Sequence, residues 1–195
     1  MWLVVGLGNP GSKYKFNRHN IGFLCLDHFL TDSSAKWRSE HKAETIRFEL
    51  ENKTTIFAKP QTFMNLSGES VQSLMAFYKI PLEQVIVVHD EIDIPCGTLK
   101  IQKNRGPGGH NGLKSINEQL STQDYIRVKL GVGKPIHPGQ DVSSHVLGNF
   151  SEPEASVLAS FLELGGDAIE SIILNGFDKA ASLFSGKKIE SGSET

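Results

Sequence analysis

The sequence is poor in cysteine and has no long hydrophobic run. Its 195 residues include only Cys25 and Cys96, too few for a disulfide scaffold and typical of a reducing compartment. No stretch approaches eighteen consecutive apolar residues, and the first residues lack the basic segment and long apolar run of a secretory leader. We therefore expect a cytoplasmic protein with neither a membrane-spanning helix nor a secretory leader.

Internal repeats and linkers are also missing. A chain of 195 residues, 38% of them hydrophobic, is long enough to bury one core. Strand-like and helix-like segments alternate along it, which is typical of an α/β fold. We expect a three-layer α/β single domain over residues 1–184, with a central mixed, mostly parallel β-sheet flanked by helices, and a tail at 185–195 that frays.

The spacing of apolar residues predicts the individual elements. Strands are predicted at 2–7, 84–91, 98–104 and 125–133, with a hairpin over 43–60 that turns at Asn52-Lys53. Helices are predicted at 21–30, 67–80 and 113–120, and one or two more over 151–184 with a break near Gly165-Gly166. Asn20 and Ser67 are the expected N-caps of the first two helices.

Charge of one sign is locally scarce, although the net charge is only −2. Residues 1–26 contain three basic residues and no acid, residues 98–134 contain seven basic residues and two acids, and residues from 151 onward contain eight acids and three lysines. Glycine-rich turns lie in both basic segments. Phosphate sites combine positive charge with close backbone approach, so this pattern favours an anionic partner near the basic segments. We expect the acidic C-terminal third to face away from that partner.

The first glycine-rich turn matches a dinucleotide-binding fingerprint in letters only. Gly6, Gly8 and Gly11 have the G-x-G-x-x-G spacing after a predicted strand. The fingerprint requires a helix that starts at the turn and an acid at the end of a second strand. No helical stripe follows Gly11, and the first acid, Asp27, falls inside a predicted helix. A nicotinamide-dependent oxidoreductase is therefore disfavoured.

Polar residues follow several predicted strands, and ligands of α/β sheets bind where parallel strands end. Asn9 lies in the first turn, Asn65 just before a helix, Asp90 at the end of a strand and Asn111 in a glycine-rich loop. His19 follows the first turn by ten residues. A neutral imidazole can take a proton from water, a carboxylate can orient that imidazole, and asparagine amides can stabilise an oxyanion. This set is typical of a hydrolase of esters that forms no covalent intermediate.

The residues alone leave the identity of the base open, because His110 beside Asn111 is a serious rival to His19. The other histidines fit worse: His28 and His41 suit a helix face and a solvated loop, His89 alternates to the opposite face from Asp90, and His137 and His145 lie in a loop that no pattern places. Strand alternation also splits the "HDEID" residues between two faces, and neither cysteine has an evident base nearby. These residues favour neither a structural zinc site nor a cysteine nucleophile.

Four blocks of sequence together resemble the bacterial peptidyl-tRNA hydrolase family. They are "GLGNPG…Y…RHNIG" from residue 6, "KPQTFMNLSG" from 59, "VVHDEIDIPCG" from 87 and "GPGGHNGLKSI" from 106, and the likeness continues to "DVSSHVLGNF" at 141–150. The resemblance implies hydrolysis of the ester between a peptide and the 3′ ribose of tRNA, which recycles tRNA for translation. The implied partner is the acceptor end of peptidyl-tRNA, and neither metal nor cofactor is implied.

The resemblance also implies roles for individual residues. His19 would activate water, Asp90 would hold His19 in its basic form, and Asn9 would distinguish a blocked peptidyl group from a free aminoacyl group. Asn65 and Asn111 would bind the peptide main chain and the water or oxyanion. Tyr14 and Phe63 would line the cleft near the tRNA 3′ end.

The resemblance identifies the residues that hold tRNA phosphates less clearly than it identifies the catalytic residues. The candidates are Lys100, Lys103, Arg105 and Lys129. Gln102 occupies a position where a second lysine is expected, and Lys129 one where arginine is common, so phosphate binding would lose a bidentate fork. The alternative function is a non-catalytic RNA-binding module of the same fold. We expect a monomer, because no apolar heptad or stripe indicates assembly.

Overall fold

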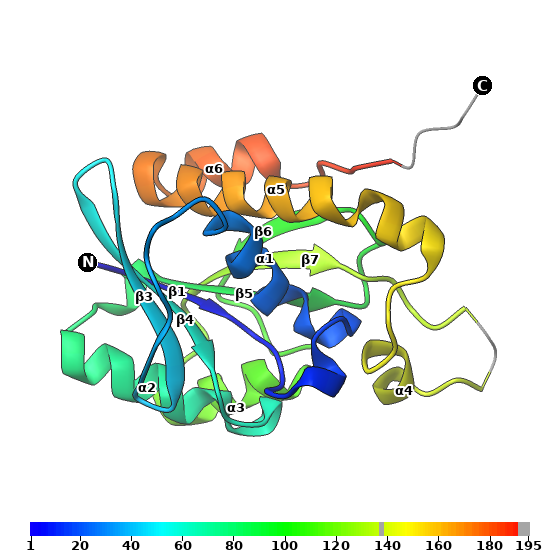
Figure 1. The fold of residues 1–195 in the computed structure, drawn as a ribbon, viewed down its shortest axis with the longest axis horizontal. Coiled ribbons are helices and arrows are strands. Elements are labelled where there is room, and N and C mark those ends of the chain that lie inside the picture. Colours follow the sequence, from blue (N-terminus) through cyan, green and yellow to red (C-terminus); the bar gives the residue numbers. More distant parts are fainter. Residues whose placement is uncertain (137–138, 191–195) are drawn as a thin grey trace.

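Seven strands form one mixed sheet in the computed structural model, which describes residues 1–136 and 139–190 (Figure 1). Their order across the sheet is β2-β3-β4-β1-β5-β7-β6. The strands are β1 (Trp2–Gly6), β2 (Arg38–Glu40), β3 (Ala43–Leu50), β4 (Lys53–Pro60), β5 (Val85–Glu91), β6 (Leu99–Lys103) and β7 (Ile126–Gly131). The pairs β4–β1, β1–β5 and β5–β7 are parallel, and the other three pairs are antiparallel. Only β3 and β6 therefore run against the remaining five strands.

Helices cover both faces of the sheet, which confirms the predicted three-layer α/β architecture. On one face lie α1 (Ile21–Phe29), α5 (Glu152–Asn175) and α6 (Phe177–Phe184), and on the other lie α2 (Ser67–Tyr78) and α3 (Asn111–Leu120). Alternate residues of the central strands enter two separate cores: Val4 packs with α1 and α5, whereas Val5 packs with α2 and α3. No helix in the described part of the chain is long and apolar enough to cross a bilayer.

The predicted break near Gly165-Gly166 is wrong, because α5 runs without interruption to Asn175 and ends at Gly176. A Cβ atom on Gly165 would lie 2.8 Å from the Cys25 sulfur, and one on Gly166 would lie 2.7 Å from a ring carbon of Phe29. These two glycines thus allow α1 and α5 to approach closely. Gly176 has a φ of 90°, a conformation that favours glycine and ends the helix.

One predicted N-cap is wrong, because Ser67 is the first residue of α2 and its hydroxyl donates to the Met64 carbonyl. Asn20 does occupy the N-cap position of α1, although its side chain makes no capping hydrogen bond. The hairpin turns at Glu51-Asn52, one position earlier than expected, with φ values of 42° and 67°. Two consecutive residues with positive φ are typical of a type I′ turn.

The C-terminal segment is paired further than predicted. Gly186 donates to the Leu99 carbonyl at 2.8 Å, Leu99 donates to Lys187 at 2.9 Å, and Ile189 donates to Gly97 at 2.9 Å. The tail expected to fray from 185 is therefore held along β6 as far as Ile189. Residues 191–195 and His137 lie outside the described residues.

Candidate active site

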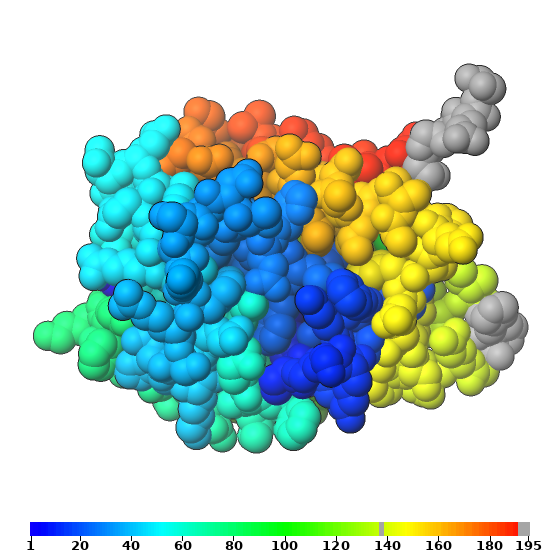
Figure 2. All heavy atoms as spheres, in the orientation of Figure 1, coloured from blue at the N-terminus to red at the C-terminus, as the bar shows by residue number. Residues whose placement is uncertain are grey.

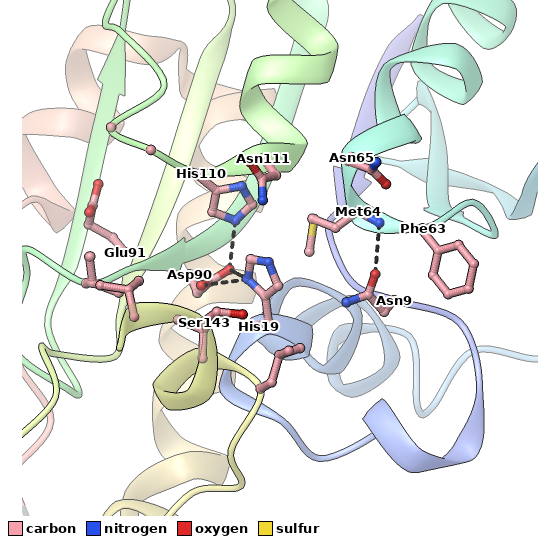
Figure 3. Close-up of a pocket in the computed structure, with 16 residues that line it drawn as sticks. Asn9, His19, Phe63, Met64, Asn65, Asp90, Glu91, His110, Asn111 and Ser143 are labelled. Atoms are coloured by element: carbon pink, nitrogen blue, oxygen red, sulfur yellow. Dashed lines mark hydrogen bonds and ion pairs between the residues drawn. The ribbon is translucent and has the colours of Figure 1, made fainter. Parts of the chain in front are cut away.

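A cavity of about 590 Å³ opens at the carboxyl ends of β1 and β5 (Figure 3). Parallel strands place their carboxyl ends at one edge of a sheet, so residues far apart in sequence meet there. Of the predicted site residues, the structure brings together Asn9, His19, Phe63, Asn65, Asp90 and Asn111. Tyr14 is not among the lining residues. The segment 142–147, which no pattern placed, forms one wall with α4 (Val142–Val146).

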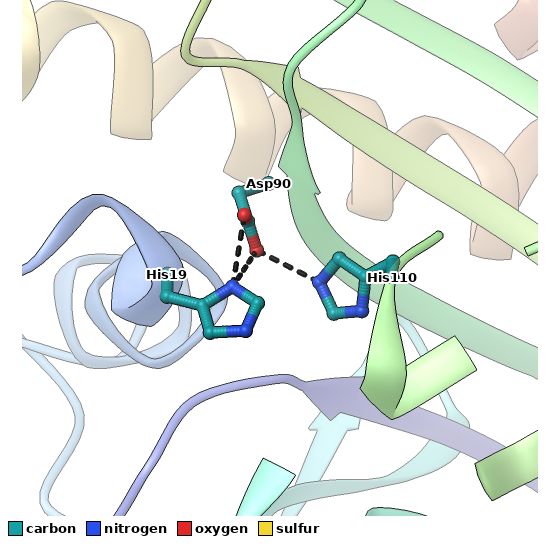
Figure 4. Close-up of side chains that lie close together, drawn as sticks. All are labelled: His19, Asp90 and His110. Atoms are coloured by element: carbon teal, nitrogen blue, oxygen red, sulfur yellow. Dashed lines mark hydrogen bonds and ion pairs between the residues drawn. The ribbon is translucent and has the colours of Figure 1, made fainter. Parts of the chain in front are cut away.

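Asp90 lies between two histidines (Figure 4). Its carboxylate oxygens are each 2.9 Å from Nδ1 of His19, and Oδ1 is also 2.8 Å from Nε2 of His110. Asp90 is buried and the two imidazole side chains are about a tenth exposed. A charged hydrogen bond that is largely screened from water holds its geometry well, so both rings are oriented by one carboxylate.

The hydrogen bonds give the two histidines different tautomers. Nδ1 of His110 accepts from the backbone N–H groups of Gly112 at 3.1 Å and Leu113 at 3.4 Å, so the proton of neutral His110 is on Nε2 and points to Asp90. His19 donates from Nδ1, which leaves a lone pair on Nε2. That nitrogen faces away from Asp90 and has no hydrogen-bond partner among the described residues. Only His19 is therefore arranged to accept a proton from a molecule in the cavity.

The ionisation of the pair follows from burial and charge. Burial opposes the charging of His19, but the charge and hydrogen bond of Asp90 outweigh it and raise the pKa of His19 above its ordinary value. Burial likewise opposes ionisation of Asp90, yet the two histidines hold the pKa of this carboxyl well below its usual range. At neutral pH Asp90 is thus a carboxylate that stabilises a proton on His19.

Asn9 is held in place by Asn20, a buried residue that the sequence had indicated only as a helix cap. The Asn20 side chain accepts from the Asn9 backbone N–H and donates to the Asn9 carbonyl, both at 2.9 Å. Asn9 Oδ1 accepts from the Met64 N–H at 2.8 Å, so the Nδ2 group is left toward the cavity (Figure 3). The amide is thereby presented as a hydrogen-bond donor. In the sequence, only the position of Asn20 next to His19 could have indicated that Asn20 is a site residue.

Asn65 and Phe63 lie across the cavity from His19 and Asp90, whereas Asn111 lies beside His110 (Figure 3). All three are exposed, Phe63 by 59%, and neither amide side chain has a hydrogen bond to any described residue. Asn65 does not cap α2, since the residue before that helix is Leu66. Polar groups with no protein partner, next to an exposed aromatic ring, are suited to binding a ligand that has both polar and flat apolar parts.

His19, Asp90 and His110 also form a group that could hold a metal ion, since one donor atom of each lies within 4.8 Å of the others. The hydrogen-bond pattern fits this less well, because Nε2 of His110 carries the proton that it donates to Asp90. His89 does not extend the group. It is buried with its ring centroid 5.1 Å from that of His110, and its Nδ1 contacts the Asp90 carbonyl oxygen at 2.7 Å.

The four basic candidates differ in their surroundings. Lys100, Lys103 and Arg105 are exposed, whereas Lys129 is paired with Glu91 at 2.9 Å and is only 12% exposed. A further basic residue, Arg127, was not singled out by the sequence. It is fully buried and donates to the carbonyls of Arg105 and Gly106, so it fixes the glycine-rich loop that leads to His110 and Asn111.

Comparison with known proteins places this geometry in context. The family model for peptidyl-tRNA hydrolase matches residues 3–192. A protein of Bdellovibrio bacteriovorus named peptidyl-tRNA hydrolase is 54% identical over 186 residues, which cover 94% of this chain and 99% of that protein. One of the same name from Trichlorobacter lovleyi is 44% identical and covers 97% of this chain and 98% of its own. The crystal structure of peptidyl-tRNA hydrolase from Acinetobacter baumannii superposes with a TM-score of 0.89 at 29% identity and 96% coverage of both chains.

Proposed function

Because the chain belongs to the peptidyl-tRNA hydrolase family, a family of hydrolases acting on the ester of peptidyl-tRNA, we propose that His19 is the general base of its reaction. The observation that carries this proposal is the open Nε2 of His19 on a ring whose Nδ1 is bound to Asp90. A non-catalytic RNA-binding module, the alternative function, would not require a histidine oriented by a carboxylate in a cavity. The family membership and the paired histidine together favour an enzyme.

The reaction that we propose needs one water molecule. Nε2 of His19 removes a proton as the water oxygen bonds to the ester carbonyl carbon, and Asp90 stabilises the resulting imidazolium. The carbonyl oxygen becomes an oxyanion, which accepts hydrogen bonds from the amide side chains of Asn9 and Asn111. Collapse of this intermediate breaks the bond to the ribose 3′ oxygen, which takes the proton back from His19. The products are a peptide carboxylic acid and tRNA.

The exposed residues that line the cavity support a proposal for substrate binding. Asn65 and Asn111 would hydrogen-bond the peptide main chain, with Asn9 reading the blocked amino group, and Phe63 would stack on the 3′ end of the tRNA. Tyr14 lies outside the cavity lining, on the turn Ser12–Tyr14, so we assign it to the tRNA end rather than to the reacting ester.

Phosphates of the tRNA acceptor end would be held by the exposed Lys100, Lys103 and Arg105. Lys129 can join them only if a phosphate competes with Glu91 for its ammonium group. We further propose a monomer that works without metal or cofactor in the cytoplasm, where translation supplies the substrate. A chelator should leave hydrolysis unchanged, and a loss reversed by added metal would contradict the metal-free mechanism.

The test of the base is hydrolysis of an N-acetylated aminoacyl-tRNA by the wild-type protein and by His19→Ala. Loss of the base should reduce kcat by about 10²–10⁴-fold, while tRNA binding and folding persist. His28→Ala is the matched control, because His28 is an exposed histidine of α1 outside the cavity. Undiminished turnover by His19→Ala would refute the assignment.

A further inference from the structure

Arg18 precedes His19 in the same short turn, Arg18–Asn20, but does not line the cavity. Its side chain is directed to α5, where it makes a two-point ion pair with Glu154: Nε to Oε1 at 3.2 Å and one terminal nitrogen to Oε2 at 2.6 Å. The two side chains are only 12% and 18% exposed. Such forked pairs fix direction as well as distance when water is largely excluded.

The same guanidinium also contacts α4. Its other terminal nitrogen donates to the His145 carbonyl at 3.2 Å. Close by, the Arg18 backbone N–H donates to Gly148 at 3.0 Å, and Asn17 forms a bridge with Asn149. Residues 12–20, dark blue, and the segment around α4, yellow, accordingly lie side by side in both views (Figures 1 and 2).

Few other side-chain hydrogen bonds attach the wall formed by α4 to the rest of the protein. Among the described residues, its one further side-chain hydrogen bond to another element is from Nε2 of His145 to the Val132 carbonyl, at 3.3 Å. The Asp141 carboxylate accepts hydrogen bonds from the backbone N–H and the hydroxyl of Ser144, within the segment itself. Yet Val142, Ser143 and Val146 line the cavity directly. The position of this wall relative to His19 therefore depends heavily on Arg18.

Glu154 is itself a fixed partner. Its carboxylate accepts from the Ser151 N–H at 2.6 Å, in the capping box that begins α5. Burial disfavours its charge, but hydrogen bonds from Arg18 and Ser151 hold the pKa of Glu154 below its ordinary value, so the carboxylate is ionised at neutral pH. One guanidinium thus joins the turn of the base, the α4 wall and the start of a 24-residue helix.

We propose that Arg18 is a positioning residue that fixes the α4 wall against the turn of His19, and thereby sets the affinity of the cavity for the peptidyl end of the substrate. The inference rests on the proposed function of the cavity. Arg18 does not touch Asp90 or the reacting atoms, so its loss should weaken binding and leave the proton transfer at His19 in place.

The test compares kcat, KM and the pH profile of wild type, Arg18→Lys and Arg18→Met on N-acetylated aminoacyl-tRNA. Arg18→Met should raise KM about tenfold, equal to about 1.4 kcal/mol, with kcat within about twofold and an unmoved acid limb. Arg18→Lys keeps the charge without the fork and should raise KM by an intermediate factor. Amide hydrogen exchange over 142–147 should be faster in Arg18→Met, which reports the wall directly.

Arg47→Met is the control, because Arg47 is an exposed arginine of β3 with no ion pair to any described residue. Should Arg18→Met fail to fold, Glu154→Gln retains an oxygen for the capping box and should still raise KM. A fall in kcat at constant KM, or unchanged exchange and kinetics in a folded variant, would overturn the proposal. Failure of the proposed function is separate: it would show as an active His19→Ala protein.

Discussion

Two groups of polar residues in the cavity differ in what they already bind. In the buried group, Asp90 lies between His19 and His110, and nearly every polar atom has a protein partner. In the exposed group, Asn65 and Asn111 have no hydrogen bond to a described residue. The first arrangement is preorganised for charge development, and the second is left open for the substrate.

This contrast predicts which property each substitution should change. Removing a member of the buried group leaves a buried partner unpaired, which costs both chemistry and stability. Removing an exposed amide costs contacts to the substrate or its transition state, with little loss of stability. Variants of the two groups should therefore separate in kcat, KM and free energy of unfolding.

The largest effect of the following variants is expected for Asp90→Ala, which should lower kcat by about 10²-fold or more. Without the carboxylate, only burial acts on the pKa of His19, and burial lowers it. In the proposed mechanism the catalytic form is neutral His19, so the acid limb of kcat/KM should move to lower pH. The test is to measure kcat/KM between roughly pH 5 and 8 for wild type and Asp90→Ala. An acid limb at the same pH in both proteins would contradict the proposed effect of Asp90 on His19.

His110→Asn should reduce kcat by a smaller factor, about tenfold. Asparagine can replace the helix cap that His110 provides at α3 but cannot reach Asp90 as imidazole does. His110→Ala should lose the same activity and a further ~1 kcal/mol of unfolding free energy. Measuring kcat and urea unfolding for both variants separates the hydrogen bond to Asp90 from the helix cap. Equal unfolding free energies of the two variants would show that the cap does not stabilise the protein.

Asn65→Ala and Asn111→Ala should raise KM by about three- to tenfold and change the unfolding free energy by less than about 0.5 kcal/mol. Asn111→Ala should also lower kcat, because it removes one of the two proposed oxyanion donors. Asn20→Ala is the contrasting variant, because it leaves the buried backbone groups of Asn9 without partners and should cost about 1–3 kcal/mol. Denaturant titration and steady-state kinetics of the three variants test these expectations. A large loss of unfolding free energy in the Asn65 or Asn111 variant would contradict the assignment of these amides to the substrate.

The smallest effect concerns salt. Lys103→Ala should reduce the slope of log affinity for tRNA against log salt by about one phosphate contact. Lys129→Ala should reduce it less, since Glu91 already neutralises this ammonium group. Binding titrations over a range of salt concentrations measure both slopes, and the reverse order would show that phosphate displaces Glu91.

Much of the fold and of the candidate site could be predicted from the sequence. Runs of β-branched residues indicated the central strands, and alternation sent their side chains to two cores. Because parallel strands end at one edge, polar residues after β1, β4 and β5 had to meet, and Asn9, Asn65 and Asp90 do so. These features depend on local pattern and on a general property of parallel sheets.

Other features depend on contacts that no local pattern encodes. The choice between His19 and His110 depends on two backbone N–H groups of α3 that occupy one nitrogen of His110. Gly165 and Gly166 were expected to interrupt a helix, but they lie within α5 because α1 packs too closely there for a larger side chain.

The sequence by itself thus determined the order of the elements and the set of polar groups at the sheet edge. Only the tertiary structure decided which nitrogen is left to accept a proton and what holds the wall beside it. The physical reason is that a hydrogen bond requires distance and direction between particular atoms. Arg18 and Glu154 meet these requirements across 136 positions of sequence, and only the packing of α5 against the sheet brings them together.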